Sequence, residues 1–475
     1  MSDLLWTLPE LLKITGGRLI GSWFLGVNGV SIDTRTLKYG DLYFAVRGDS
    51  LDGHDFIAKA VARGAAASCV SEEKIDSLIG ERGNFIVVQD VSQALEELGK
   101  ISRARMVGKI IAVTGSVGKT TTKEALKAAF SPNGPTHSSV ESYNNHWGVL
   151  LTLARMPRDT KYGIFEIGMN GPGEIGELVK RVQPHLAIIT NVEAAHLGAF
   201  ESIDDISFAK AEIFDGLISG GTVLLNRDDE RFSMLSEIAR SRGIENIVTF
   251  GESEKSDSRA IQIVLQEEYS YLTASILGEK IALKVGSPGR HFIQNILAVL
   301  ATVKFLGADL SQATLALSHF TALKGRGKRY PIDYKDKSFI LIDESYNANP
   351  ASMQSALKLL GLLKPKNSGR RIAILGDMLE LGPHSSQFHA DLAVSVQENL
   401  IDKVFLVGSK MRVLRDSLQG KISCKHVEKI ECVITLVRVE IHSDDVLMVK
   451  ASLGMRFSLL VDALLYNHQE ANNDE

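Results

Sequence analysis

The sequence has few of the features that mark a secreted, metal-cluster or membrane protein. Its 475 residues include three cysteines, Cys69, Cys424 and Cys432, whose spacing suits neither a zinc site nor a disulfide framework. No apolar run approaches the length of a transmembrane helix, and the first six residues lack the basic segment and apolar core of a secretory leader. We therefore expect a cytoplasmic protein without membrane insertion.

The sequence also has no strong excess of acidic or of basic residues. The formal net charge is −4, and the 23% charged and 44% hydrophobic residues are ordinary for a globular enzyme. This balance gives no reason to expect nucleic acid as a partner, so an acidic substrate would be bound by local basic groups and helix ends. The chain is too long for one core, and its length suggests about three domains.

Residues 110–123, IIAVTGSVGKTTTK, place a buried-looking strand before a glycine-containing loop and a Lys-Thr pair at the start of a helix. Loop amides, the helix dipole and one ammonium together neutralise a polyphosphate, and the neighbouring hydroxyl can hold Mg²⁺. The commoner motif has a further glycine where this chain has Val113, so the loop is a short form. The sequence predicts a nucleoside triphosphate site formed by Gly115, Ser116, Val117, Gly118, Lys119, Thr120 and Thr121.

Apolar runs that alternate with helical patterns predict an α/β protein of three domains. We expect a small N-terminal α/β domain (1–100), a central P-loop domain with a largely parallel sheet (101–328) and a C-terminal doubly wound α/β domain (329–475). An amphipathic stretch at 91–106 is the expected connector between the first two. The main expected strands are 110–114, 163–168, 186–191, 222–226, 338–343, 371–376, 403–407 and 446–449, and the expected helices include 54–63, 173–182 and 205–218.

Three further residues are predicted near the carboxyl ends of the central strands, where open α/β sheets bind ligands. Glu166 closes one strand and could hold Mg²⁺, although a solvated edge carboxylate is an equal alternative. His196 follows the next strand and emerges at the same rim, which favours a functional histidine over a packed one. Lys210 lies on a helix expected to pass over the site. Because lysine side chains are mostly exposed, the residue type alone indicates a surface lysine.

Six blocks of sequence, in the same order, resemble the Mur ligases, the ATP-dependent amide-forming enzymes of peptidoglycan precursor synthesis. They are TGSVGKTT at 114–121, YNNHWG at 143–148, EIGMNGPGEI at 166–175, NVEAAHL at 191–197, AKAEIF at 209–214 and DESYNANP at 343–350. The Asn144–Asn145 pair, residues 346–350 and the block LGDMLELG at 375–382 resemble the family member that acts on UDP-N-acetylmuramoyl-tripeptide and D-alanyl-D-alanine. The resemblance covers nearly the whole chain and implies a monomer with these small-molecule substrates.

The resemblance also implies roles for individual residues. Lys119 would bind the β- and γ-phosphates of ATP, Thr120 and Glu166 would hold one Mg²⁺, and His196 would serve a second metal. Lys210 would be the family's carbamylated lysine, in which added CO₂ turns a cation into a carboxylate-like metal ligand. The other implied contacts are Asn295, Arg326, Asp343 and Asn347 for ATP, and Ser31, Thr34, Arg35, Asn144 and Asn145 for the UDP-linked substrate.

Such an enzyme would use ATP to convert an unreactive carboxylate into an acyl phosphate, which the amine then attacks. The contributing residues lie on different domains, so we expect closure of the C-terminal domain to complete the site. The chain departs from the family pattern at Phe292, Gly327 and Ala451, which leaves the role of the adjacent His291 open. Alternatives are a related ligase that adds another amino acid, a ligase similar to folylpolyglutamate synthetase, or an ATP-gated binding protein without ligase activity.

Overall fold

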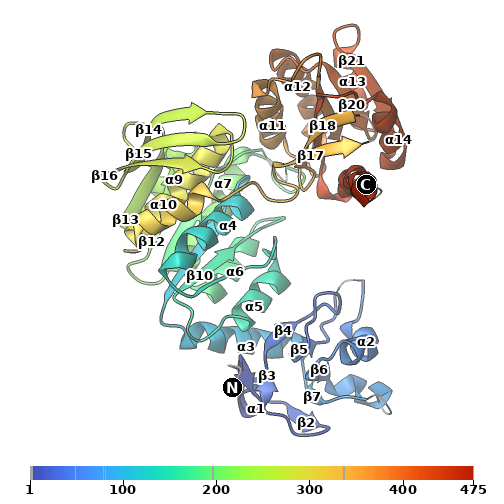
Figure 1. Cartoon of the computed structure of the whole chain (residues 1–475). Coiled ribbons are helices and arrows are strands. Elements are labelled where there is room, and N and C mark those ends of the chain that lie inside the picture. Colours follow the sequence, from blue (N-terminus) through green and yellow to red (C-terminus); the bar gives the residue numbers. More distant parts are fainter. Residues whose placement is uncertain are drawn as a thin grey trace.

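The computed structural model shows three α/β units that follow one another along the chain and form a C-shaped molecule (Figure 1). It describes residues 4–48, 50–78, 80, 82–194, 197–334 and 337–473, with side chains through residue 466. Within these ranges, no helix combines the length and the apolar character that a membrane span requires. The α/β class and the three-unit organisation predicted from the sequence are confirmed.

The N-terminal unit contains a sheet with the strand order β2-β7-β6-β5-β4, in which β2 pairs antiparallel and the other neighbours pair parallel. Asp90 caps the following helix, α3, by accepting hydrogen bonds from the N–H groups of Ser92 and Gln93. The predicted domain boundary at residue 100 falls inside this helix. The elements are β1 (Trp6–Thr7), α1 (Leu8–Thr15), β2 (Arg18–Ile20), β3 (Gly26–Val27), β4 (Gly29–Ser31), β5 (Asp41–Phe44), the 3₁₀ helix η1 (Gly53–Phe56), α2 (Ile57–Ala62), β6 (Ala67–Ser71), β7 (Phe85–Val88) and α3 (Val91–Arg105).

The central unit is organised around a sheet with the order β16-β15-β14-β13-β12-β11-β8-β10-β9. The strands from β9 to β14 pair parallel, whereas β14, β15 and β16 form an antiparallel meander at one edge. Helices α4, α9 and α10 pack on one face, and α5 to α8 pack on the other.

The strands of the central unit are β8 (Lys109–Thr114), β9 (Thr136–Ser138), β10 (Tyr162–Glu166), β11 (Leu186–Ile189), β12 (Thr222–Asn226), β13 (Asn246–Gly251), β14 (Ser258–Leu265), β15 (Ser270–Ile276) and β16 (Glu279–Val285). Its helices are α4 (Lys119–Phe130), α5 (His146–Ala154), α6 (Glu174–Val182), α7 (Ile203–Ala211), the 3₁₀ helix η4 (Glu212–Gly216), α8 (Phe232–Ser241), α9 (Arg290–Phe305) and α10 (Leu310–Ser318).

The C-terminal unit has the strand order β17-β18-β22-β19-β20-β21, with β17 antiparallel to β18 and the other pairs parallel. Helices α11 to α13 cover one face, and α14 and α15 cover the other, which is the expected doubly wound arrangement. The elements are β17 (Lys328–Tyr334), β18 (Lys337–Glu344), α11 (Pro350–Leu362), β19 (Arg371–Gly376), α12 (Ser385–Glu398), β20 (Lys403–Val407), α13 (Arg412–Leu418), β21 (Ser423–Val427), α14 (Ile430–Glu440), β22 (Val446–Lys450) and α15 (Ser458–Asn473).

All eight strands expected in the two larger units are present, with shifts of at most two residues at their ends. The predicted helix at 205–218 is a shorter α-helix, α7, that continues as the 3₁₀ turn η4. The antiparallel meander of β14 to β16 was not predicted from the sequence. The carboxyl ends of β8, β10 and β11 lie side by side, so the residues that follow these strands converge on one edge.

Candidate active site

The loop between β8 and α4 has the backbone shape of a phosphate-binding loop. Gly115 and Gly118 adopt φ angles of +150° and +85°, which are unfavourable for residues that have a Cβ atom. A Cβ at Gly115 would lie 1.9 Å from Thr190 Oγ1, and one at Gly118 would lie 2.7 Å from Asn295 Oδ1. Both glycines are therefore needed for the close approach of the loop to β11 and α9.

The end of β11 holds this loop in place. The N–H groups of Ser116 and Val117 donate to the carbonyl oxygen and the side-chain oxygen of Asn191, over 3.0 and 2.9 Å. Thr190 Oγ1 donates to Val117 O over 2.6 Å. No side chain among the described residues caps α4, so the positive end of its dipole is available to an anion in the cavity that Gly118 lines.

Lys119 begins α4, and its Nζ donates to Gly115 O over 2.7 Å, which folds the side chain back across the loop. Burial lowers the pKa of this ammonium, the Glu166 carboxylate opposes the shift, and Arg326 adds to it. Two cations thus converge where a polyphosphate would supply the compensating negative charge.

Glu166 is the last residue of β10, and its side chain is 1% exposed. Its Oε1 accepts a hydrogen bond of 2.7 Å from Asn144 Nδ2, whereas its Oε2 is buried and has no partner among the described residues. An unpaired buried carboxylate oxygen is costly, and Mg²⁺ prefers oxygen ligands of this kind. The residues present therefore fit a magnesium ion.

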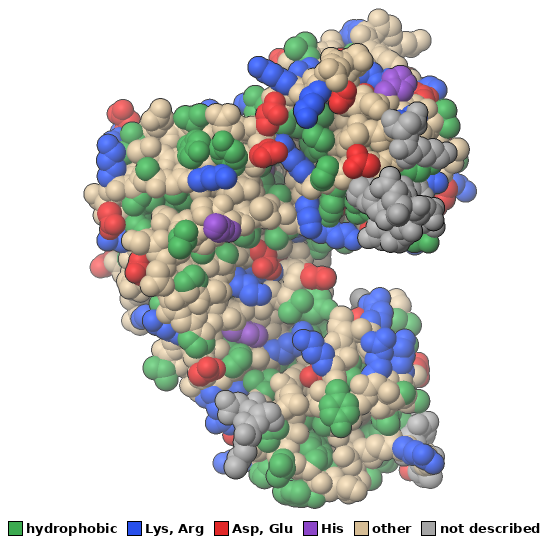
Figure 2. All heavy atoms as spheres, viewed as in Figure 1, with side chains coloured by type: hydrophobic (Ala, Val, Ile, Leu, Met, Phe, Trp, Pro, Cys, Tyr) green, Lys and Arg blue, Asp and Glu red, His purple; other side chains and the backbone are tan. Residues whose placement is uncertain are grey.

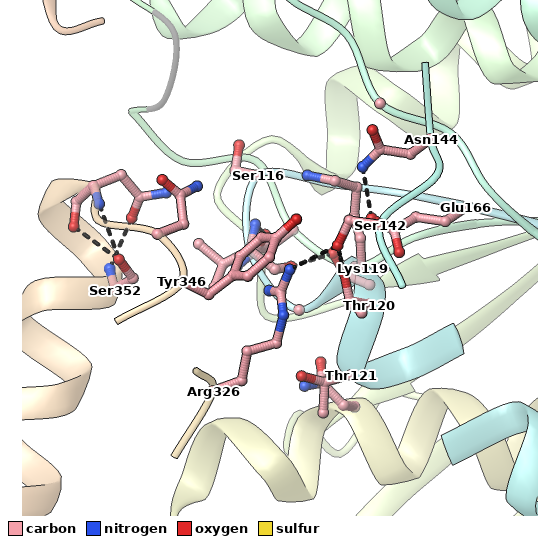
Figure 3. A pocket seen from close by; sticks show the side chains of 18 of the residues that line it. Ser116, Lys119, Thr120, Thr121, Ser142, Asn144, Glu166, Arg326, Tyr346 and Ser352 are labelled. Atoms are coloured by element: carbon pink, nitrogen blue, oxygen red, sulfur yellow. Dashed lines mark hydrogen bonds between the residues drawn. The ribbon is translucent and has the colours of Figure 1, made fainter. Parts of the chain in front are cut away.

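Arg326 enters the site from the segment that leads into the C-terminal unit. Its Nη2 donates to Ser142 Oγ over 3.1 Å, and Ser142 Oγ lies 3.1 Å from Thr120 Oγ1 at the start of α4. The guanidinium stacks 4.0 Å from the ring centre of Tyr346, and Figure 3 shows the two side chains together at the mouth of the P-loop. Ser142 thereby links Arg326 to the Thr120 hydroxyl, which the sequence predicts to bind Mg²⁺.

Asp343 does not line the cavity, and its carboxylate is fully buried. It accepts hydrogen bonds from Gly325 N over 2.7 Å and from the hydroxyl of Ser345 over 2.6 Å. The N–H of Gly327 also donates to the carbonyl oxygen of Asp343. Asp343 thus fixes the backbone on both sides of Arg326, and its predicted contact with ATP stays a prediction.

The C-terminal side of the cavity holds a second buried lysine. Lys450 is 2% exposed, and its Nζ donates to Glu344 Oε2 over 3.1 Å and to Asn347 O over 2.9 Å. His291 lines the same region, where burial lowers its pKa, Glu344 opposes the shift and Lys450 adds to it. The lowered pKa of His291 favours its neutral form.

Lys210 lies on α7 and is 2% exposed, so it is not the surface lysine that its residue type indicated. Burial and the nearby charge of Lys119 lower the pKa of Lys210 well below its usual range, against an opposing effect of Asp229. Lys210 does not line the cavity formed by the P-loop. His196 lies outside the described residues.

The predicted residues of the N-terminal unit lie apart from the nucleotide cavity. Ser31 is buried and its Oγ donates to Asp33 O over 3.0 Å, Thr34 is buried, and the exposed guanidinium of Arg35 pairs with Asp33 over 2.7 Å. Figure 2 shows a deep notch between the N-terminal and C-terminal units, with Lys and Arg side chains gathered on the N-terminal side.

The nucleotide cavity has a volume of about 350 Å³ and lies between the central and C-terminal units. Of the residues predicted from the sequence, it brings together Ser116, Val117, Gly118, Lys119, Thr120, Thr121, Asn144, Asn145, Glu166, Asn295, Arg326 and Asn347. The sequence analysis gave no role to several other lining residues, namely Ser142, Thr190, Asn191, Gln294, Glu344, Tyr346 and Lys450. Among the described residues, no group of three or more His, Cys, Asp and Glu side chains converges on one point.

The fold and the site define a three-domain P-loop protein whose nucleotide cavity is completed by an arginine from the interdomain segment. Three family models match the chain: the catalytic domain of the Mur ligase family at 26–103, the Mur ligase middle domain at 113–303 and the Mur ligase glutamate ligase domain at 332–453. The chain belongs to the Mur ligase family.

Relatives with known names are similar to the chain over nearly its full length. UDP-N-acetylmuramoyl-tripeptide--D-alanyl-D-alanine ligase of Rickettsia prowazekii is 33% identical and covers 97% of this chain and 99% of its own length. The enzyme of the same name from Escherichia coli is 31% identical and covers 97% of this chain and 98% of its own length. The crystal structure of MurF from Acinetobacter baumannii aligns with a TM-score of 0.81 at 30% identity, covering 97% of this chain and 99% of that one.

Proposed function

We propose that this chain joins D-alanyl-D-alanine to UDP-N-acetylmuramoyl-tripeptide, with conversion of ATP to ADP and phosphate, in peptidoglycan precursor synthesis. Relatives with that activity in their names support the proposal. The geometry that supports it is the meeting of the P-loop lysine, a buried carboxylate and Arg326 in one cavity.

The reaction divides into two steps with balanced charge. The substrate carboxylate attacks the γ-phosphorus of ATP, which gives an acyl phosphate and ADP, and the dipeptide amine then displaces phosphate and loses a proton. Lys119 and the first turn of α4 would bind the phosphates, while Arg326 would approach from the segment that leads into the C-terminal unit. These groups act by neutralising charge and fixing the geometry of attack.

We further propose that Thr120 and Glu166 hold a Mg²⁺ ion. When bound, Mg²⁺ neutralises phosphate charge and orients the transferred group. The buried Oε2 of Glu166 and the hydroxyl pair of Thr120 and Ser142 support this assignment. Water and phosphate oxygens would complete the coordination shell, as is usual for magnesium. The second metal at His196 stays a prediction.

The buried amine of Lys210 supports the proposed carbamate. Carbamylation requires a neutral amine, which adds to CO₂ and releases one proton, and burial beside Lys119 favours the neutral form. With ¹³C-bicarbonate, the chain is expected to give a carbamate carbon signal that is missing from Lys210→Ala. The matched control is Lys127→Met, which changes an exposed lysine on α4 and should keep the signal. Wild-type protein without a carbamate signal would contradict the assignment.

The remaining proposals concern the substrate and the state of the protein. Ser31, at the end of β4, and the nearby Thr34 and Arg35 are proposed to receive the uridine diphosphate end of the substrate. The nucleotide cavity is formed within one chain, which supports a monomer as the working unit. The use of ATP and a UDP-linked substrate supports a cytoplasmic location.

The test is phosphate release from ATP with each component omitted in turn. We expect release to require Mg²⁺, UDP-N-acetylmuramoyl-tripeptide and D-alanyl-D-alanine together, with the pentapeptide product identified by mass. Release with a single amino acid in place of the dipeptide would assign the chain to a related step. Release with a pterin substrate would favour the folylpolyglutamate-type alternative, and no release with any amine would favour a binding protein.

A further inference from the structure

Lys123 lies one turn beyond Lys119 on α4 and is fully buried, with 0% of its surface exposed. Burial of an ammonium is costly unless each of its protons has an acceptor. Here three acceptors are present: Ser139 O at 2.8 Å, Glu124 Oε1 at 2.7 Å and the carbonyl oxygen of Glu141. The three N–H groups of Lys123 are therefore all paired, two of them with one short stretch of backbone.

That stretch, residues 139–145, is here called the bridging segment. Within it, Glu141 has a φ of +47°, in the left-handed region, which costs a residue other than glycine about 1–2 kcal/mol. The side chain of Glu141 is exposed, so the contact of its carbonyl oxygen with Lys123 is what ties this strained residue to the domain. Ser139 adds a second attachment, because its Oγ accepts from Glu166 N over 3.1 Å.

The bridging segment carries two side chains that contact the proposed reaction machinery. Ser142 Oγ lies 3.1 Å from Thr120 Oγ1 and accepts from Arg326 over 3.1 Å. Asn144 Nδ2 donates to Glu166 Oε1 over 2.7 Å, which leaves the other carboxylate oxygen for a cation. Figure 3 shows Ser142 and Asn144 approaching the start of α4 and the end of β10.

We propose that Lys123 is a positioning residue of this site: its ammonium holds the bridging segment in the one conformation that places Ser142 and Asn144 against Arg326 and Glu166. The inference rests on the proposed ligase function. It extends that function by adding a buried lysine that does not line the nucleotide cavity. Lys123 acts through the segment, because α4 fixes its Cα while two of its three bonds hold the backbone opposite, one at Ser139 and one at the strained Glu141.

The experiment compares Lys123→Met with wild type in the phosphate-release assay at varied Mg²⁺. Methionine keeps the length of the side chain but donates no hydrogen bond. We expect kcat to fall by about 10- to 100-fold, as for a small misplacement of reacting groups. The Mg²⁺ concentration for half-maximal activity should rise by about tenfold, as when a group that orients a metal ligand is lost. Lys127→Met, on the exposed side of the same helix, should match wild type in both respects.

A second variant separates positioning from stability. Glycine adopts a positive φ without strain, so Glu141→Gly should return part of the lost kcat when combined with Lys123→Met. If Lys123→Met does not fold alone, the double variant is compared with Glu141→Gly. Wild-type values of kcat and Mg²⁺ requirement in folded Lys123→Met would overturn the proposal. So would equal values for the double variant and Glu141→Gly, or a double variant that does not fold. An inactive wild type would instead count against the proposed function.

Discussion

The central unit meets its two neighbours through interfaces of opposite character. Toward the N-terminal unit, Leu150, Leu151 and Ala154 of α5 belong to the same buried apolar cluster as Trp6. Toward the C-terminal unit the contacts include polar ones, such as Arg326 with Ser142, one partly buried apolar side chain, Phe388, packs against the central core, and residues of both units line a cavity. The first interface resembles a domain interior and the second a cleft that can open. We infer that the first two units move together and that the C-terminal unit moves against them.

The largest expected effect comes from the apolar interface. Trp6 is 1% exposed, its Nε1 donates to Ala154 O over 2.9 Å, and the Arg105 guanidinium lies 3.5 Å from its ring centre. Trp6→Ala should lower the free energy of unfolding by about 3–5 kcal/mol, measured by urea denaturation. Trp23→Ala removes a ring that is 67% exposed and should change stability by about 0.5 kcal/mol or less. Equal losses for the two variants would contradict a continuous core.

A substitution at the polar interface should lower activity strongly and change the stability of the fold little. Arg326→Ala removes the cation that faces the P-loop, and kcat should fall by about 10²- to 10³-fold, as when one preorganised charge donor is lost. The urea midpoint should stay near that of wild type, because Arg326 contributes no apolar core. Lys328→Ala, an exposed cation two residues away, is the matched control and should keep wild-type kcat. A large stability loss in Arg326→Ala would show that this interface is structural.

We infer that the segment around Arg326, which leads into the C-terminal unit, is the hinge of this motion, and its Gly325 has a φ of +74°. A Cβ there would lie 2.9 Å from Tyr346 Cβ, whereas a Cβ at Gly243, with a φ of +75°, would meet no atom within 4 Å. Both Gly→Ala variants should lose about 1 kcal/mol of stability from backbone strain. Gly325→Ala should in addition lower kcat about tenfold, because the side chain displaces the ring that stacks on Arg326. Equal kcat in the two variants would argue against a hinge at this position.

The same contrast explains what the sequence could predict. Strands and the P-loop were predictable because their signals are local: side-chain periodicity, two glycines and a Lys-Thr pair. Ser142 and Tyr346 carry no such signal, because their roles depend on contacts with Arg326: Ser142 lies 184 residues before it, and Tyr346 lies on a different segment after it. Lys123 looks like any lysine in GKTTTK, and its burial follows from the fold of the bridging segment. The family resemblance supplied Asn295, whose approach to Gly118 no local pattern indicates.

The smallest expected effect is the pH dependence of the N-terminal interface, where Glu10 on α1 pairs with Arg158 of the central unit. Burial raises the pKa of Glu10, but hydrogen bonds from the Thr7 backbone and Arg158 outweigh it and lower the pKa from 4.5 to about 2. A carboxylate with a lowered pKa stabilises the fold fully above pH 4.5, and this contribution is lost as the pH falls toward 2. Both side chains are partly exposed, so Glu10→Gln should cost at most about 1 kcal/mol near neutral pH. Urea denaturation at pH 7 and pH 2.5 should show the difference between variant and wild type shrinking in acid, and a pH-independent difference would exclude the ion pair as its cause.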